Sequence, residues 1–344
     1  MLGIDRRAAS ATWTAALVLL LLFLIYMVRS TLFVFVLALL FAYLLSPLVN
    51  LLDRAIPSRT RTPALAVAYL IFIGIVVVAS IKIGSRVVSE GTRLASAFPS
   101  MVSNWQPPGE IGLIKAELVQ RAQNELASRS ADVVTFLSHA GFRFLSVASG
   151  LIYVVIIPVL AFFFLKDAPV MRQHILDLVA EGPRRAMVDD VLEDIHLLLA
   201  HYMRALVLLS LSAFTAYSIC FSIMGVPYAI LLAALGGMLE FIPMVGPLTA
   251  SGSILIVAAV SGANILPLVI FLVAYRVCQD YILSPHLMEQ GVELHPLLVL
   301  FGVFAGAEIA GVAGTFLSVP VLAMVRILYV RIRKAKVGAK VALA

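Results

Sequence analysis

The sequence predicts an all-α protein that crosses a membrane several times. Hydrophobic residues make up 62% of the 344 residues and charged residues 13%, and the mean hydropathy is +1.05. A soluble globular domain is about half apolar and about a quarter charged. Several apolar stretches reach the length of about 20 residues that a helix needs to cross the bilayer. Since the backbone of a spanning segment must satisfy its own hydrogen bonds in lipid, we expect these stretches to be helices.

The N-terminal membrane region is predicted to extend over residues 1–81. Its first two spans, 13–28 and 31–49, are separated only by Arg29-Ser30. The basic pair before the first span would also suit a signal peptide. However, no small-residue cleavage site follows and the chain turns apolar again, which indicates a signal-anchor helix and a tight hairpin. A third span is predicted from 64 to about 81.

Residues 82–143 are predicted to form an extramembrane helical region. Charges of both signs return here, and "WQPPGE" indicates a turn. Beyond it, apolar residues recur at helical spacing opposite charged ones, which predicts an amphipathic helix over 111–126. We interpret it as a helix that lies against the spans or a neighbouring subunit. A membrane-surface helix is the alternative, which the mixed charge weakens.

A fourth span is predicted at 144–165, followed by a cytoplasmic helical region at 166–204. The second region contains the acidic run "DDVLEDIH", which we interpret as a solvated helix face, so no metal site is expected. Cys220 and Cys278 lie in apolar runs without CxxC spacing and are interpreted as small hydrophobic side chains. No cofactor is expected.

The remaining chain divides into a C-terminal transport core, 205–325, and a basic tail, 326–344, that contains no acidic residue. About eight membrane segments fit the whole pattern. The short basic segments, which are the N-terminal arginines, the 53–61 loop and the tail, favour an even number of crossings with both termini cytoplasmic. The expected location is the cytoplasmic membrane. The net charge of +6 follows from these flanking residues, so nucleic acid is not an expected partner.

Four ionisable residues are embedded in or border the apolar runs of the core: Glu240, Arg276, Asp280 and Glu308. A charge at the bilayer centre costs about 2.5–3.5 kcal/mol even on the lenient insertion scale, so such residues usually face a protein interior or a wet cavity. Arg276 and Asp280 are spaced to pair on one helix face, and simple charge compensation is an alternative explanation for them. The two glutamates have no cation within one helical turn, which makes them candidate substrate-binding or coupling groups.

Both glutamates begin similar short segments, "EFIPMVG" (240–246) and "EIAGVAG" (308–314). Each has a helix breaker at its fourth position and a glycine at its seventh. Paired, interrupted apolar segments are typical of transporters built from repeats, in which freed backbone groups bind substrate near mid-membrane. We therefore predict two broken or re-entrant helical hairpins, at 235–252 and 304–320, that meet near mid-membrane. A packing kink is the structural alternative.

The segment "SPHLMEQGVELHP" (284–296) combines prolines, a glycine and two histidines. It indicates a membrane-edge loop or a break between two helices. His286 or His295 could relay protons, and a structural role at the interface is the favoured interpretation.

Several of these segments together resemble the AI-2E family of transporters, the autoinducer-2 exporter or PerM-like permeases. They are "FFFLKDAP" (162–169), "LEFIPMVGPL" (239–248), "QDYILSPHL" (279–287), "VELHPLLVL" (292–300) and "GVAGTFLSVPVLAM" (311–324). Ala168 and Met244 depart from residues that are common in the family. The resemblance implies a multi-pass transporter that assembles as a homo-oligomer. Carried onto this chain, its motif positions are Glu240, Pro243, Gly246, Pro247, Asp280, Pro285, Pro296, Gly311, Gly314 and Pro320.

The expected function is transport of a small polar solute, similar to autoinducer-2, by export coupled to a proton or ion gradient. Glu240 and Glu308 would supply the coupling or substrate carboxylates, and Arg276 and Asp280 would support or gate them. Sodium or lithium/proton antiport is the first alternative. A membrane scaffold and an intramembrane enzyme are further alternatives. The enzyme is disfavoured because the sequence contains no HExxH, GxSxG or Walker A motif.

Overall fold

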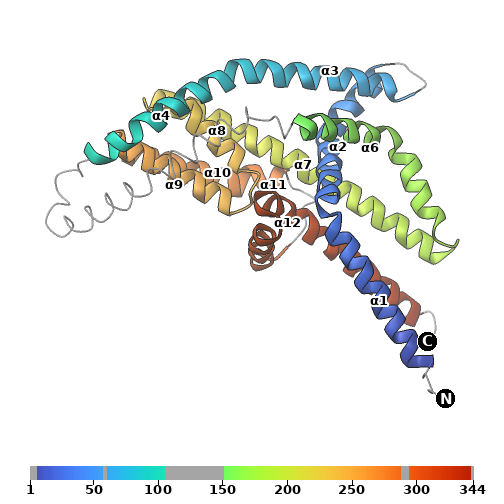
Figure 1. Cartoon of the computed structure of the whole chain (residues 1–344). Coiled ribbons are helices and arrows are strands. Elements are labelled where there is room, and N and C mark those ends of the chain that lie inside the picture. The colour runs from blue at the N-terminus through green and yellow to red at the C-terminus, as the bar shows by residue number, and fades with distance from the viewer. Residues whose placement is uncertain (1–5, 57–59, 105–150, 288–293, 342–344) are drawn as a thin grey trace.

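The computed structural model describes residues 6–56, 60–104, 151–287 and 294–341, and every regular element in these ranges is a helix (Figure 1). Five helices are long and apolar enough to cross a membrane. They are Arg29–Ala55, Thr62–Asn104, Pro183–Ile223, Ile265–Leu287 and Pro296–Lys334. Shorter apolar helices accompany them, at Thr12–Met27, Ala229–Leu239 and Val245–Val260. The predicted all-α, multi-pass architecture is confirmed.

The N-terminal half is built from long helices. Helix α1 covers Arg6–Met27 and α2 covers Arg29–Ala55. Helical hydrogen bonds run through the junction, from the Val28 N–H to the Leu24 carbonyl and from the Leu32 N–H to the Val28 carbonyl, both at 3.0 Å. The two helices therefore follow one another almost end to end (Figure 1), and the predicted tight hairpin is wrong. Helix α3 (Thr62–Ala79) continues through a π-helical turn, η1 (Ser80–Gly84), into α4. The predicted extramembrane region therefore begins as a direct helical extension of the third span.

Helix α4 (Ser85–Asn104) packs into the C-terminal half of the molecule. Its residues Leu94, Phe98 and Val102 follow each other at four-residue intervals and are buried against the later helices. Figure 1 shows α3 and α4 as one long path along the top of the view, ending beside α8 and α9. The amphipathic helix predicted over 111–126 lies outside the described residues.

Helices α6 (Leu151–Asp177) and α7 (Pro183–Ile223) form an antiparallel pair at the polar region 166–204. The acidic run on α7 makes ion pairs on two sides. Arg172 of α6 lies 2.7 Å from Asp189 and 2.6 Å from Glu193. Hydrogen bonds to Asp189 and then Glu193 raise the pKa of the Arg172 guanidinium, so it stays charged. The acidic residues of this run therefore make contacts between helices, in addition to forming a hydrated helix face.

On its other side, the acidic run of α7 binds the end of α12. Arg331 reaches Asp194 at 2.6 Å and Asp190 at 2.8 Å. These pairs place the α6–α7 turn and the start of the basic tail at the same end of the molecule.

The C-terminal half contains the shorter and interrupted helices: α8 (Ala229–Leu239), α9 (Val245–Val260), α10 (Ile265–Cys278), the π-helical turn η2 (Gln279–Leu283), α11 (Ser284–Leu287) and α12 (Pro296–Val341). Helix α12 carries non-helical backbone at Ala310 and Gly311. The two segments predicted to be broken are therefore both interrupted, between α8 and α9 and within α12.

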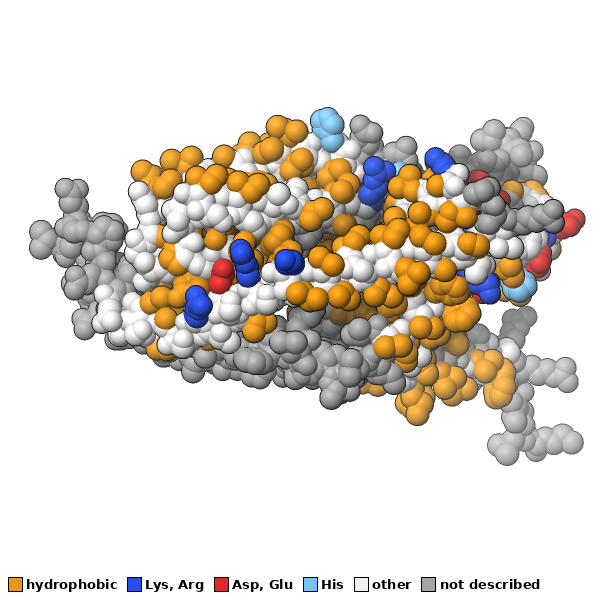
Figure 2. All heavy atoms as spheres, turned by 90° about the horizontal axis from the view of Figure 1, so that it is seen from above, with side chains coloured by type: hydrophobic (Ala, Val, Ile, Leu, Met, Phe, Trp, Pro, Cys, Tyr) orange, Lys and Arg blue, Asp and Glu red, His pale blue; other side chains and the backbone are white. Residues whose placement is uncertain are grey.

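Buried apolar residues form three clusters. The first joins α4, the C-terminal half of α7, and α8 to α10; the second joins α2, α3 and α6; the third joins α2, α7 and α12. Around them the outer surface is largely apolar, as Figure 2 shows for one face. Leu19 and Phe23 of α1, for instance, are 67% and 60% exposed. An apolar outer surface of this extent suits a lipid environment.

Candidate functional site

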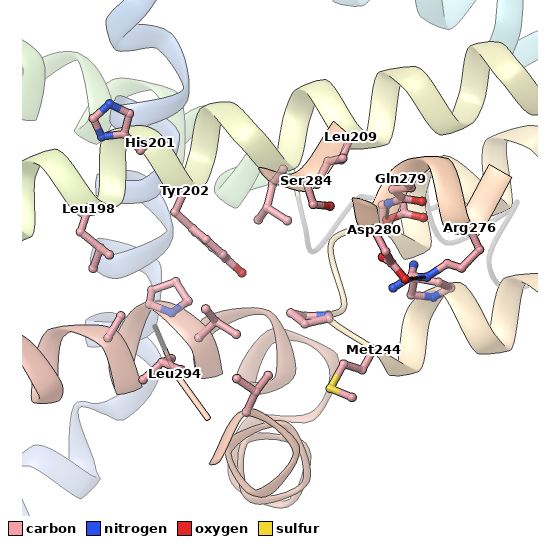
Figure 3. Close-up of a pocket in the computed structure, with 18 residues that line it drawn as sticks. Leu198, His201, Tyr202, Leu209, Met244, Arg276, Gln279, Asp280, Ser284 and Leu294 are labelled. Atoms are coloured by element: carbon pink, nitrogen blue, oxygen red, sulfur yellow. Dashed lines mark hydrogen bonds and ion pairs between the residues drawn. The ribbon is translucent and has the colours of Figure 1, made fainter. Parts of the chain in front are cut away.

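A cavity of about 300 Å³ lies between α7, the α8–α9 connection, η2 and α12. One wall is α7, which contributes Tyr202, Leu206 and Leu209. The opposite wall carries most of the polar groups, and α12 closes a third side with Val319 and Pro320. Figure 3 shows these walls around an open centre. The site is therefore built from segments far apart in the sequence.

The α8–α9 connection begins at Glu240 and turns within a few residues. Met244 has a φ of 61°, a left-handed value, just before α9 starts at Val245. The turn is held by the Gly246 N–H, which donates to the Ile242 carbonyl at 3.0 Å. Gly246 is required for this geometry, because a Cβ there would lie 1.8 Å from the Leu239 carbonyl oxygen. The predicted breaker motif thus creates a compact turn beside the carboxylate.

Glu240 is buried, with 7% of its surface exposed, and it lines the cavity. The Nε2 atom of Gln279 donates a hydrogen bond of 2.6 Å to its carboxylate. Burial of a charge without partners is expensive, so this bond stabilises the carboxylate in place. A buried acid at the cavity wall is available to exchange a proton or bind a cationic or hydroxyl group.

The π-helical turn η2 brings consecutive polar residues to the cavity. Gln279 and Asp280 both line it, together with Arg276 at the end of α10. The Arg276 Nε atom donates to Asp280 at 2.8 Å, with each side chain a little over 40% exposed, so the pair that the i,i+4 spacing predicted is present. Single π-helical turns inside helices occur frequently at functional sites.

Helix α12 is folded back on itself at Gly311, whose φ is 60°. The two arms touch at Gly306 and Gly314, since a Cβ on either would come within 2.3 Å of a backbone oxygen of the other. Only glycines permit this approach, which is the small-residue packing used between membrane helices. The predicted 304–320 segment is therefore a helical hairpin.

Glu308 lies at the tip of this hairpin and is exposed. It does not line the cavity, whereas Pro320 further along α12 does. The two interrupted segments still contact each other, because the rings of Phe241 and Phe316 lie 6.0 Å apart. The structure brings together Glu240, Arg276 and Asp280, and it leaves Glu308 apart from them.

The remaining motif residues have local roles. Pro243 and Pro247 line the cavity beside Glu240, and Pro285 lies in the short helix α11. Pro296 is the first residue of α12, and His295 caps that helix by accepting a 3.3 Å hydrogen bond from the Leu297 N–H. The His286 ring, in α11, bonds the Ile282 carbonyl of the preceding π-helical turn η2.

The sequence interpretation did not single out four polar residues that line the cavity, which are His201, Tyr202, Gln279 and Ser284. Gln279 is uncharged and was passed over in favour of Asp280, although a glutamine in an apolar helix is itself a signal. Tyr202 lies in the region predicted to be cytoplasmic. Gln279 and Tyr202 belong to the site because both line the cavity, and because the Gln279 Oε1 atom and the Tyr202 hydroxyl oxygen are buried without a hydrogen-bond partner among the described residues.

Comparison with known proteins assigns the chain to a family. The family model described as AI-2E family transporter matches residues 15–334, nearly the whole chain. The chain belongs to the AI-2E transporter family. The resemblance found in its motifs is thereby confirmed, and the coarse function is that of a membrane transporter or permease.

Named relatives of this AI-2E family member are assigned to transport. The candidate transport protein YueF of Bacillus subtilis (strain 168) is 25% identical over 303 residues, which cover 84% of this chain and 81% of YueF. The candidate permease PerM of Escherichia coli (strain K12) is 23% identical over 303 residues, 84% of each chain. The candidate transport protein YrrI of B. subtilis is 29% identical over 175 residues, which span 51% of this chain and about half (49%) of YrrI.

Proposed function

We propose that this AI-2E family member exports a small polar solute, similar to autoinducer-2, across the cytoplasmic membrane, coupled to a proton or ion gradient. The observation that carries the proposal is the cavity in which buried Glu240 faces the Arg276–Asp280 pair beside an interrupted helix. Its volume of about 300 Å³ is at the lower end of the range for small-molecule sites. Glu240 is the proposed coupling group, since it is the buried carboxyl of the site.

The proposed orientation has both termini in the cytoplasm. Arg331 at the start of the basic tail pairs with Asp190 and Asp194 near the α6–α7 turn. This contact supports the proposal that the two polar regions share one side of the membrane, and the excess of Lys and Arg in the tail favours the cytoplasmic side. Assembly as a homo-oligomer is part of the same proposal and rests on the family resemblance.

The test is solute flux in proteoliposomes that contain the purified full-length protein. With an imposed pH gradient and autoinducer-2 as solute, the parent protein should give flux above that of empty vesicles. Glu240→Gln should lose most of this flux and its pH dependence, because the amide cannot exchange a proton. Glu181→Gln, an exposed acid near the α6–α7 turn, is the control and should behave like the parent. Full flux in Glu240→Gln with normal pH dependence would contradict the proposed role of Glu240.

Sodium or lithium/proton antiport is the second candidate. It is favoured by the charge of the cavity, because Arg276 already pairs with Asp280 and leaves Glu240 as the surplus acid among the described lining residues. Vesicles loaded with a pH-sensitive dye distinguish the two functions. Antiport predicts proton movement on addition of sodium alone, without any organic solute. A scaffold or an intramembrane enzyme predicts no flux of either kind.

A further inference from the structure

Two buried polar atoms that have no hydrogen-bond partner within the described part of the chain belong to residues on different walls of the cavity. One is Oε1 of Gln279 on η2, whose residue is only 3% exposed, and the other is the hydroxyl oxygen of Tyr202 on α7. Leaving a buried polar group unpaired costs free energy, and most such groups in native proteins have partners. In Figure 3 the Tyr202 side chain extends from α7 into the open centre, with Gln279 on the far side.

The orientation of the Gln279 amide is set by its neighbour. Its Nε2 atom donates to Glu240 at 2.6 Å, which leaves Oε1 to accept from another donor. An amide oxygen can only accept, whereas a tyrosine hydroxyl can donate or accept. A solute that forms hydrogen bonds with both the Gln279 Oε1 atom and the Tyr202 hydroxyl must therefore offer at least one donor, which a hydroxyl group supplies.

The charges of the lining disfavour an anionic solute. Its ionisable side chains, apart from Tyr202, are Glu240, Asp280, Arg276 and His201. Arg276 is engaged by Asp280 at 2.8 Å, and the His201 ring is bonded to the Leu197 carbonyl of its own helix. Among the described lining residues, an anion would meet the buried Glu240 carboxylate without an unpaired cation to compensate. The repulsion between two like charges is stronger beside a buried group than in water.

The size and the apolar walls disfavour a bare cation as the main occupant. Leu206, Leu209 and Val319 line the same volume, which is about 300 Å³. A water molecule occupies about 30 Å³ of liquid, so the space exceeds what one cation needs and suits a short carbon skeleton.

We propose that Tyr202 and Gln279 are solute-binding residues that select an uncharged, hydroxyl-bearing solute over an anion of the same size. The hydroxyl groups of the solute donate to Gln279 Oε1 and bond the Tyr202 hydroxyl, while the carbon skeleton contacts the leucine and valine side chains. This assignment rests on the proposed transport function and adds to it the two residues and the selection rule.

Osmotic swelling of proteoliposomes tests the rule with a matched pair of probes, erythritol and its acid erythronate. Erythritol should enter vesicles that contain the parent protein faster than empty vesicles, and erythronate should not. Gln279→Leu and Tyr202→Phe should each lower protein-dependent erythritol entry about tenfold, the effect of one lost hydrogen bond of about 1.4 kcal/mol. A binding role also predicts that the concentration for half-maximal entry rises more than the maximal rate falls.

The controls are Gln173→Leu and Tyr281→Phe, exposed residues of the same types that do not line the cavity. Both should match the parent, and thermal unfolding checks that all variants are folded.

Parent-like erythritol entry in Gln279→Leu and Tyr202→Phe would overturn the assignment of these residues and leave the transport function standing. Erythronate or sodium entry as fast as that of erythritol would overturn the selection rule. Entry of none of the probes would overturn the solute class, and autoinducer-2 flux then decides separately whether transport stands.

Discussion

Gly246 lies where the chain turns back after Glu240, and its missing side chain is a geometric requirement. The nearest backbone oxygen, that of Leu239, would lie 1.8 Å from a Cβ atom at this position. Substitution would push the turn apart and shift Glu240 relative to Gln279. The residue pattern predicted a break here, and the close approach explains why the break requires glycine in addition to proline.

Gly246→Ala should destabilise the protein by about 1–3 kcal/mol, the usual range for overpacking, and should reduce transport because the turn that presents Glu240 is displaced. Thermal unfolding and flux of the purified protein measure the two effects. Gly252→Ala, in helix α9 with open space around the added Cβ, is the matched control. The explanation is wrong if both variants have the same stability.

Charged residues were identified from the sequence because a charge in an apolar run stands out. Glu240, Arg276 and Asp280 were found in this way and do share one cavity. Glu308 was selected by the same reasoning, yet it lies exposed at a hairpin tip. Gln279 and Tyr202 were missed because their importance comes from unpaired polar atoms, which depend on neighbours from other helices.

At the scale of single elements, helix α8 depends on a residue from far away in the chain. Its N-cap position, Tyr228, makes no capping bond with its own side chain. The carboxylate of Glu90 on α4 accepts a 2.9 Å hydrogen bond from the Leu231 N–H in the first turn of α8. An acid at this end also interacts favourably with the helix dipole. Helix α4 therefore supplies the N-terminal cap of α8, the helix that leads to Glu240.

Glu90→Ala should cost about 1 kcal/mol, the usual effect of losing a helix cap, because the Leu231 N–H loses its partner. Glu90→Gln keeps an acceptor oxygen without the charge and should lose only part of that stability. Thermal unfolding of the three proteins in the same detergent gives the comparison. An equal loss in both variants would show that the charge, rather than the hydrogen bond, is what matters.

Short sequence patterns predicted where the helices are interrupted. They did not predict whether each interruption forms a turn or a hairpin. Breakers after Glu240 and Glu308 indicated where helices stop. Whether a stop produces a turn or a hairpin depends on what packs against it, and for α12 this is the contact of Gly306 with Gly314. The π-helical turn η2 was not predicted, because its residues, QDYIL, follow α10 without a proline or glycine that would indicate a change of helix type.

At the scale of the whole molecule, two long helical paths connect the apolar clusters. The path from α3 to α4 leaves the cluster around Leu65 and ends in the cluster around Phe98. Helix α7 contributes Leu199 to one cluster and Tyr217 to another. Near its start, α7 is also tied to α6 and α12 by ion pairs of Arg172 and Arg331. Helix α7, which lines the cavity, is therefore held in position by two apolar clusters and by ion pairs with α6 and α12.

Arg331→Gln should lower stability by up to about 1 kcal/mol, since partly exposed ion pairs contribute little each but Arg331 makes two of them. Salt screens such pairs, so the difference from the parent should shrink as ionic strength rises. Thermal unfolding at low and high salt provides the measurement. Arg333→Gln, an exposed arginine of the same tail, is the control, and a salt-independent difference for Arg331→Gln would contradict an ionic origin.

The sequence by itself determined the membrane class, the helical architecture, the places where helices are interrupted and the family, because apolar run length, breakers and motifs are local properties of the chain. Tertiary structure alone decided which of the marked residues share a cavity. It joined Glu240 to Gln279, 39 positions apart, with a 2.6 Å hydrogen bond, placed Tyr202 across from them and left Glu308 outside. The physical reason is that burial and hydrogen-bond pairing arise between helices, and no single stretch of sequence contains both partners.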